Sequence, residues 1–389
     1  MSDAYIVTAV RTAGGRKGGR LKDWHPVDLA AAVIDAVVSR AGADPSAIDD
    51  VILGSVMQIG EQAVNVARNA VLASKLPITV PGTSVDRQCG SSQQALHFAA
   101  QAVKAGAMDL VIAGGVESMT RVPMGLSVML PAQNNYGTYM SPALAARYGV
   151  VPFSQFLGAE MMAEKYGLSR EELDAFAYDS HRKAAAATKA QAFADEILPL
   201  PVQAEGREIT HDSDEGIRFD ASLEAIRAVK LIREGGMITA ATSSQICDGA
   251  SALLIASDAG LKMTGTKPLA RIHTMCVLGG DPVIMLETPI AATGRALAKA
   301  GLRLSDIDLF EVNEAFASVP LAWLKETGAD PARLNVRGGA IALGHPLGAT
   351  GTKLMTTLIH ALQDGNKRYG LQTMCEGGGM ANVTIVERL

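Results

Sequence analysis

The residue in this sequence best placed for nucleophilic chemistry is Cys89. It stands between residues 83–87, which read as extended, and a segment that reads as a helix from residue 92. A cysteine at a helix N-terminus gains from the backbone N–H groups and the helix dipole, which favour the thiolate over the thiol. Cys89 is therefore a candidate nucleophile. The alternative is a small buried core residue, the usual role of a free cysteine.

His345 and Cys375 lie in two glycine-rich segments further along the chain. Glycines let a backbone approach a ligand closely, and histidine is the commonest base for a cysteine nucleophile. Three glycines, 377–379, follow Cys375 after one residue, and their N–H groups could point at an oxyanion. The alternatives are a loop histidine satisfied by the backbone and an incidental cysteine in a turn. The glycine spacing matches no phosphate-binding loop.

Asn313 is a fourth candidate, because it follows a predicted buried strand at residues 308–311. Polar residues at the C-terminal ends of strands often line the sites of α/β proteins. An asparagine that caps the following helix is an equally good interpretation.

The elements that must position these residues alternate between helix and strand. This α/β pattern covers the start of the chain and returns after residue 250. From residue 119 to residue 249 the rhythm breaks, and a capping box at Ser169 opens a helix that runs to about Ala187. We therefore predict an insertion here. Outside it we predict helices at 28–39 and 92–105, and strands at 51–54, 110–114, 308–311 and 382–386.

A short internal repeat relates residues 41–49 to residues 300–308, and each copy leads into a predicted strand. Two similar α/β halves around an insertion would explain the repeat. Short matches of alanine and glycine also arise by chance, so the repeat alone carries little weight.

The composition excludes several functional classes. The 389 residues have a formal net charge of -5, which gives no general attraction for nucleic acid or an anionic membrane. No apolar run is long enough to span a bilayer. The four cysteines form no C-x-x-C pair, so we expect neither a disulfide framework nor a metal site. Free thiols, with no signal peptide or peroxisomal tripeptide, predict a cytoplasmic protein.

Over essentially its whole length the chain resembles the thiolases. Five elements match in order: Arg87-Gln88-Cys89-Gly90-Ser91, Ala113-Gly114-Gly115-Val116-Glu117-Ser118-Met119, Asn313-Glu314-Ala315-Phe316, Gly338-Gly339-Ala340-Ile341-Ala342-Leu343-Gly344-His345-Pro346 and Cys375-x-Gly377-Gly378-Gly379. The resemblance implies an α/β fold, a five-layer αβαβα sandwich of two similar halves. Residues 1–118 with 250–270 would form the N-terminal half, 119–249 an inserted loop domain for CoA and oligomer contacts, and 271–389 the C-terminal half.

The resemblance also implies the reaction and the role of each residue. 3-Ketoacyl-CoA would be cleaved by CoA to acetyl-CoA and a shortened acyl-CoA, reversibly, through an acyl-Cys89 intermediate. His345 would take the proton of Cys89, and Cys375 would exchange the proton at the acetyl α-carbon. One oxyanion hole would use His345 and a water held by Asn313, and the other the backbone N–H groups of Cys89 and Gly377. One lost oxyanion donor typically costs about 3–4 kcal/mol.

The expected partners are CoA and acyl-CoA thioesters, which are substrates, so no cofactor is expected. Arg218 matches the family arginine near the adenine, and Ser244 matches the serine that touches pantetheine. The family is oligomeric, so a homodimer or homotetramer is expected.

The chain departs from the family pattern in its pocket. Biosynthetic acetoacetyl members usually carry His-Met-Gly where this chain has Phe156-Leu157-Gly158. The missing histidine argues for a broader or bulkier 3-ketoacyl substrate. Cys247 stands where asparagine is usual, and we interpret Cys247 and Cys276 as structural.

Three alternatives remain open. An acetoacetyl-CoA-specific acetyl-CoA acetyltransferase differs in substrate alone. A decarboxylating ketoacyl synthase would share the fold, but the Cys375-x-Gly-Gly-Gly element argues against it. A thiolase-like lipid- or sterol-binding protein would not need Cys89, Asn313, His345 and Cys375 together.

Overall fold

The computed structural model describes residues 3–149, 152–204 and 206–389. Its centre is a mixed 11-stranded sheet with the strand order β11-β12-β13-β10-β1-β9-β5-β3-β4, in which β2 also pairs with β9 and β6 with β1. These strands are β1 (Tyr5–Thr12), β2 (Gly15–Arg16), β3 (Asp50–Gly54), β4 (Gly82–Val85), β5 (Leu110–Ser118), β6 (Ile197–Leu198), β9 (Cys247–Ala256), β10 (Ala270–Gly279), β11 (Leu309–Val312), β12 (Tyr369–Glu376) and β13 (Met380–Arg388).

The two halves of this sheet have the same topology. The order β1-β9-β5-β3 in the first half corresponds to β10-β13-β12-β11 in the second. The halves join where β1 pairs with β10 through Tyr5–Arg271 and Ile6–Ala270. A short 3-10 turn precedes β3 at Pro45–Ala47 and β11 at Leu304–Asp306. The two similar halves predicted from the short repeat are therefore confirmed.

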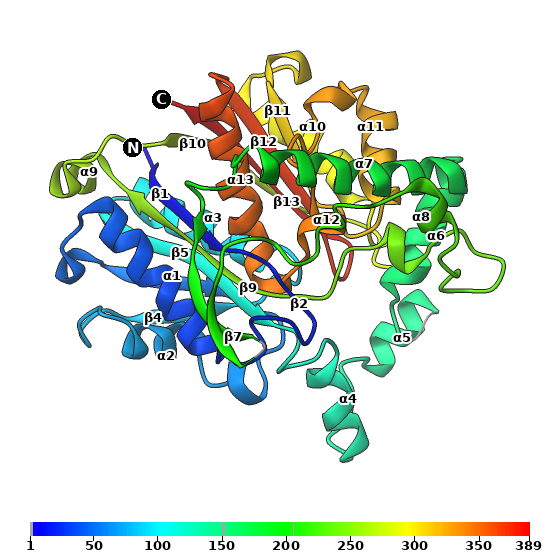
Figure 1. Cartoon of the computed structure of the whole chain (residues 1–389), viewed down its shortest axis with the longest axis horizontal. Helices are drawn as coiled ribbons and strands as arrows, with labels where there is room; N and C mark the ends of the chain where they lie inside the picture. The colour runs from blue at the N-terminus through cyan, green and yellow to red at the C-terminus, as the bar shows by residue number, and fades with distance from the viewer. Residues whose placement is uncertain (1–2, 150–151, 205) are drawn as a thin grey trace.

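Helices cover both outer faces of the half-sheets and fill the space between them (Figure 1). Outside the first half lie α1 (Pro26–Ala41) and α2 (Val66–Ala73), and outside the second lie α10 (Thr288–Ala300) and α11 (Ser318–Thr327). Between them lie α3 (Ser91–Lys104) and α13 (Thr350–Asp364), whose apolar residues share one buried cluster with both half-sheets. The five-layer αβαβα sandwich is thereby confirmed.

The predicted elements are present with small shifts in their bounds. The helix predicted at 28–39 is α1, which Pro26 opens at its first turn and Gly42 ends in the left-handed conformation. The strand predicted at 110–114 continues to Ser118. Gly114 and Gly115 lie within this strand, and a Cβ on Gly115 would lie 2.1 Å from Gly348 O. They are therefore needed for close packing.

Residues 119–249 form a largely separate layer of helices with a hairpin of their own. The capping box at Ser169 is present, since its Oγ accepts from Glu172 N–H at 3.2 Å and its N–H donates to Glu172 Oε2 at 2.6 Å. The elements are α4 (Leu126–Gln133), α5 (Pro142–Tyr148), α6 (Gln155–Lys165), α7 (Arg170–Lys189), β7 (Leu200–Ala204), β8 (Arg207–His211) and α8 (Leu223–Arg227). Among the described residues of this segment, only β6 and the start of β9 pair with strands of the central sheet.

The remaining helices are α9 (Asp258–Thr264) and α12 (Ala340–Leu343). Among the described residues, no helix has the length and apolarity needed to cross a bilayer. Within the same ranges, no group of three or more His, Cys, Asp or Glu side chains is arranged to hold a metal ion.

Candidate active site

Cys89 lies in a tight turn between β4 and α3. Gln88, just before it, has a φ of 51°, a left-handed conformation that is uncommon for a residue other than glycine. Backbone hydrogen bonds from Gly90 to Arg87 O (3.1 Å) and from Ser91 to Gln88 O (3.0 Å) close the turn. The Cys89 side chain is half-buried, one residue before the helix N-cap Gly90. The strand-to-helix turn predicted around Cys89 is thus present.

The expectation that the helix N-terminus favours the thiolate of Cys89 is wrong for the resting site, whose surroundings keep Cys89 as a thiol until a base acts on it. Burial and then the nearby Glu376 carboxylate raise the pKa of Cys89 to about 12. The backbone N–H groups of Cys89 and Gly377 reach its sulfur and favour the thiolate. Two N–H groups that converge on one sulfur can also stabilise an oxyanion formed there.

His345 is fixed in one tautomer. Its Nδ1 lies 2.6 Å from Thr350 Oγ1, and that hydroxyl donates its only proton to Pro346 O at 2.9 Å. Thr350 Oγ1 must therefore accept from Nδ1–H, which leaves the lone pair on Nε2. His345 Nε2 is buried and has no hydrogen-bond partner. It is free to accept a proton.

The charge state of His345 is also fixed. Burial, and then the Lys353 ammonium, lower the pKa of His345 to about 3, so the ring is neutral near pH 7. Lys353 lies on α13 and its Nζ donates to Leu343 O and, at 3.1 Å, to Gly344 O. These carbonyls end α12 and directly precede His345. Sequence reasoning missed Lys353 and Thr350, although a single charged residue in the uncharged stretch from Thr350 to Ile359 is a signal that could have found the first.

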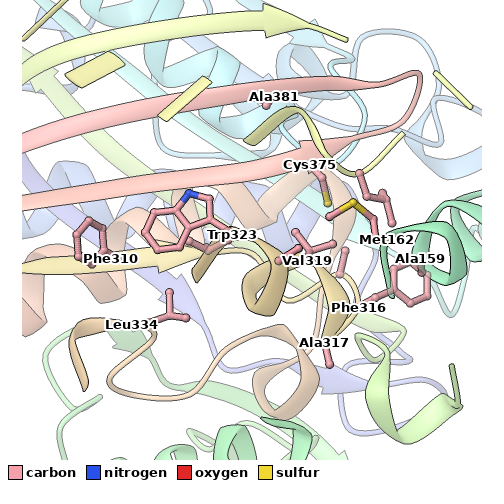
Figure 2. Packing of buried hydrophobic residues seen from close by; sticks show 14 of the residues in the cluster. Ala159, Met162, Phe310, Phe316, Ala317, Val319, Trp323, Leu334, Cys375 and Ala381 are labelled. Carbon is pink, nitrogen blue, oxygen red and sulfur yellow. The ribbon is translucent and has the colours of Figure 1, made fainter. Parts of the chain in front are cut away.

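Cys375 lies near the end of β12 and is 1% exposed. Figure 2 shows it on the same side of the apolar cluster as Met162 of α6 and Val319 of α11. Burial, and then Cys89 and Glu376, raise the pKa of Cys375 well above its usual value. The two cysteines lie in segments that touch, because Glu376, next to Cys375, packs on Gly90, next to Cys89. Cys375 is thus a protonated thiol beside the candidate nucleophile.

Asn313 follows β11, and its N–H donates to Thr373 O of β12 at 3.1 Å. Its side chain is 1% exposed, and neither its Oδ1 nor its Nδ2 has a partner. Buried amides are almost always hydrogen-bonded, so this one is available to a water or a substrate oxygen. The helix-cap interpretation of Asn313 is wrong, because α11 begins only at Ser318 and its N-cap is Ala317.

Contacts between the ends of the elements bring these loops together. Thr352 N–H of α13 donates to Ser92 Oγ of α3 at 3.0 Å, so the two central helices meet at their N-terminal ends. The buried Glu117 carboxylate at the end of β5 accepts from Gly348 N–H at 2.8 Å and from Val56 N–H at 2.9 Å. The loops that carry Cys89 and His345 are therefore held together at the C-terminal end of β5.

The two residues expected at CoA lie in adjoining segments. Arg218 is exposed, and its backbone N–H donates to His181 Nδ1 at 3.2 Å. Ser244 is half-buried, and its N–H donates to Ala315 O at 2.9 Å, two residues after Asn313. The segments are tied together because Gln245 Nε2 donates to Gly216 O at 2.9 Å.

Phe156 on α6 stacks edge-to-face on Phe316, with ring centroids 5.6 Å apart and an interplanar angle of 76°. A small cavity of about 140 Å³ next to it is lined by Phe156, Leu157, Glu160 and Ile238, among others. One aromatic ring of α6 thus packs on Phe316, three residues after Asn313. Cys247 and Cys276 are both free and buried, and a Cβ on Gly344 would lie 2.6 Å from Cys247 Sγ.

Known proteins resemble this chain along its whole length. Residues 4–259 match the family described as "Thiolase, N-terminal domain" and residues 266–388 match "Thiolase, C-terminal domain". A steroid 3-ketoacyl-CoA thiolase, FadA6, of Mycobacterium tuberculosis is 50% identical over 100% of this chain and 95% of its own. A 3-ketoacyl-CoA thiolase of Pseudoalteromonas translucida is 43% identical over 100% of both chains. The crystal structure of the Bacillus anthracis acetyl-CoA acetyltransferase has a TM-score of 0.91 and 36% identity, covering 100% of this chain and 99% of that one.

Proposed function

This chain belongs to the thiolase family, and on that premise we propose how its residues divide the reaction among themselves. The protein is an acyltransferase that cleaves 3-ketoacyl-CoA with CoA, giving acetyl-CoA and a shortened acyl-CoA. The observation that carries the proposal is the neutral His345 with a free Nε2, beside a site where two thiols are both held protonated.

In the first half-reaction Cys89 is the nucleophile. His345 Nε2 takes the Cys89 proton, and the thiolate attacks the C3 carbonyl of the substrate. The backbone N–H groups of Cys89 and Gly377 stabilise the oxyanion that forms on C3. The C2–C3 bond then breaks, which leaves the acyl group on Cys89 and the enolate of acetyl-CoA.

The enolate is where the second thiol acts. The protonated His345 Nε2–H and a water held by Asn313 stabilise the enolate oxygen. Cys375 donates its proton to C2, and acetyl-CoA leaves. In the second half-reaction the Cys375 thiolate takes the proton of the CoA thiol, which attacks the acyl-Cys89 thioester. Cys89 leaves and regains its proton from His345, so every group returns to its starting state.

We propose a 3-ketoacyl-CoA bulkier than acetoacetyl-CoA as the substrate. Phe156 supports this, because it stands in place of the histidine common in acetoacetyl members and stacks on Phe316. The name of the 50% identical relative, a steroid 3-ketoacyl-CoA thiolase, supports it further. An acetoacetyl-CoA-specific enzyme is the second candidate, supported by the 36% identical acetyl-CoA acetyltransferase.

We propose that Arg218 and Ser244 contact CoA, near the adenine and the pantetheine respectively. The exposed guanidinium of Arg218 is open to an anionic ligand, and Ser244 adjoins the Asn313 segment. We also propose a cytoplasmic homodimer or homotetramer. Four free cysteines support the reducing compartment, and the sheet edge at β4 offers a strand for pairing with a second copy. Light scattering behind size-exclusion chromatography measures the assembly.

Thiolysis of a series of 3-ketoacyl-CoA thioesters, from acetoacetyl to long or bulky acyl groups, tests the substrate proposal through loss of enolate absorbance. We expect kcat/KM to rise from acetoacetyl-CoA to the bulkier thioesters. A preference for acetoacetyl-CoA would favour the second candidate. Failure to turn over any member would support a lipid-binding protein instead.

A further inference from the structure

The Cys89 turn and the Cys375 strand interlock through two glycines. A Cβ on Gly90 would lie 1.9 Å from Glu376 Oε1 and 2.6 Å from its Cδ, so the Glu376 carboxyl group packs directly on the Gly90 backbone. In return, a Cβ on Gly377 would lie 2.8 Å from Gln88 Oε1. The Glu376 side chain thus packs on the glycine of the Cys89 turn, and the Gln88 side chain packs on the glycine that follows Glu376. The residue after Cys89 and the residue after Cys375 are the two that touch.

Glu376 is unusual in that neither of its carboxyl oxygens makes a hydrogen bond of normal geometry, although the Asn382 N–H lies near the carboxyl group. Its side chain is 0% exposed, so both oxygens are buried. Among the described residues, only Asn313 shares the feature of two such atoms in one side chain. Burying an unpaired carboxylate is costly, so the group favours its neutral form. Burial raises the pKa of Glu376 to about 8, which the Arg87 guanidinium and the Asn382 N–H only partly oppose.

The ionisable groups around Glu376 come from several elements. Asp86 and Arg87 lie on the turn that carries Cys89, and Cys375 precedes Glu376 on β12. His97 of α3 lies beyond them, hydrogen-bonded to Thr384 Oγ1 at 2.8 Å, with its pKa lowered to about 3 by burial and then by Arg87 and Lys299 of α10. A negative charge on Glu376 raises the pKa of both Cys89 and Cys375.

We propose that Glu376 is a positioning residue for Cys89, which as a neutral carboxyl group seats the Cys89 turn on the Cys375 strand and as a carboxylate suppresses formation of the Cys89 thiolate. This rests on the proposed role of Cys89 as the nucleophile. Below about pH 8 Glu376 is protonated and adds no charge beside the sulfur. As the pH rises further, a carboxylate appears next to the site where the thiolate must form, so the alkaline gain in Cys89 reactivity is curtailed.

The effect of the Glu376 charge on Cys89 can be tested without turnover. The test is the rate of Cys89 alkylation by iodoacetamide, followed by peptide mass spectrometry. In the wild-type protein we expect the logarithm of the rate to rise with pH and to bend downwards near pH 8. In Glu376→Gln, which keeps the shape and removes the charge, the rise continues without the bend. At about pH 9.5 the variant is then roughly tenfold faster, which corresponds to one pKa unit.

Glu311→Gln is the matched control. Glu311 on β11 is also a buried acid with a raised pKa, but the charges around it are Glu314, Glu196, Arg337 and Lys183, not the thiols. We expect it to keep the wild-type bend. Glu376→Met is a second uncharged variant that should lose the bend, should Glu376→Gln fold poorly.

Three results would overturn the proposal: a wild-type profile with no bend, parallel profiles for wild type and the folded Glu376 variants, or loss of the bend in Glu311→Gln. A wrong nucleophile assignment would show differently. Turnover would then survive complete alkylation of Cys89, whatever the shape of the pH profile.

Discussion

Two buried polar regions of this molecule differ in how completely their atoms are paired. In the first, beside α13, the guanidinium of Arg11 donates to Glu196 Oε1 at 2.6 Å and to the two oxygens of Asp214 at 2.9 and 3.1 Å. In the second, around the thiols, the side chains of Asn313 and Glu376 and the Nε2 of His345 make no hydrogen bond of normal geometry. Burial is equal in both, so it does not separate scaffold from site. The two regions differ in what lies next to the unpaired atoms. Glu196 Oε2 makes no hydrogen bond but lies 3.5 Å from the Arg337 guanidinium, whereas both side-chain atoms of Asn313 and the Nε2 of His345 remain available to a substrate or water.

Lys353 connects the two regions. Its ammonium is buried near Asp214, Arg11 and Glu196, and burial lowers its pKa. It also donates to the carbonyls that directly precede His345. The paired region thus anchors the loop of the base, while the reactive face of that base stays unpaired.

The largest effect should come from removing the nucleophile in the unpaired region. Without the Cys89 sulfur no acyl thioester can form, so we expect Cys89→Ala to lower kcat by roughly 10⁴-fold or more. Steady-state thiolysis and mass spectrometry of the acyl-enzyme measure this. Cys276→Ala is the control, a buried cysteine on β10 that should retain turnover. Retained turnover in Cys89→Ala would contradict the nucleophile assignment.

The second effect separates the two thiols. A serine in place of Cys375 is a poorer proton donor to carbon, so we expect Cys375→Ser to lose cleavage and condensation by roughly 10²- to 10⁴-fold. Acylation of Cys89 by an acyl-CoA should persist in part, because it needs no carbon acid. Radiolabelled acyl transfer to the protein measures that half-reaction alone. Equal loss of both half-reactions would count against separate roles.

The sequence predicted the parts of the site that depend on local order. The extended segment, the turn at Cys89 and the helix after it follow from neighbouring residues, and the repeat at 41–49 and 300–308 predicted the two halves. The family motifs supplied the candidate residues themselves.

What the sequence did not predict depends on tertiary contacts. Lys353 and Thr350 act on His345 through the fold, and Glu376 meets Gly90 across 286 positions of sequence, from 90 to 376. The cap interpretation of Asn313 was wrong because the helix start could not be placed within a few residues.

The third effect falls on the paired region and should appear in stability. Arg11→Met leaves Glu196 and Asp214 buried without the guanidinium that hydrogen-bonds to both, so we expect the free energy of unfolding to fall by about 3–5 kcal/mol near pH 7. Burial opposes it, but Arg11 holds the pKa of Asp214 below its usual value. The stabilisation by this pair is therefore present above the unfolded pKa of Asp214 and lost as the pH falls through the folded one.

Urea unfolding of wild type and Arg11→Met at neutral and acid pH measures this difference. The gap between the two proteins should narrow as the medium becomes more acid. A gap that stays constant with pH would mean that the ion pairs do not set the stability of this region.

The smallest effect should come from Arg218, the exposed counterpart of Arg11. Its guanidinium is open to solvent, so screening limits what one charge contributes to binding an anionic ligand. We expect Arg218→Ala to raise the KM for CoA by about two- to fivefold, with a smaller change in kcat. The increase should shrink at high ionic strength, which initial rates at two salt concentrations would reveal.

Arg182→Ala is the control, because Arg182 is an exposed arginine whose partner is Asp179 on α7. An unchanged KM in Arg218→Ala would remove this residue from the CoA site. The contrast between unpaired and paired polar groups would then hold only for the buried parts of the molecule.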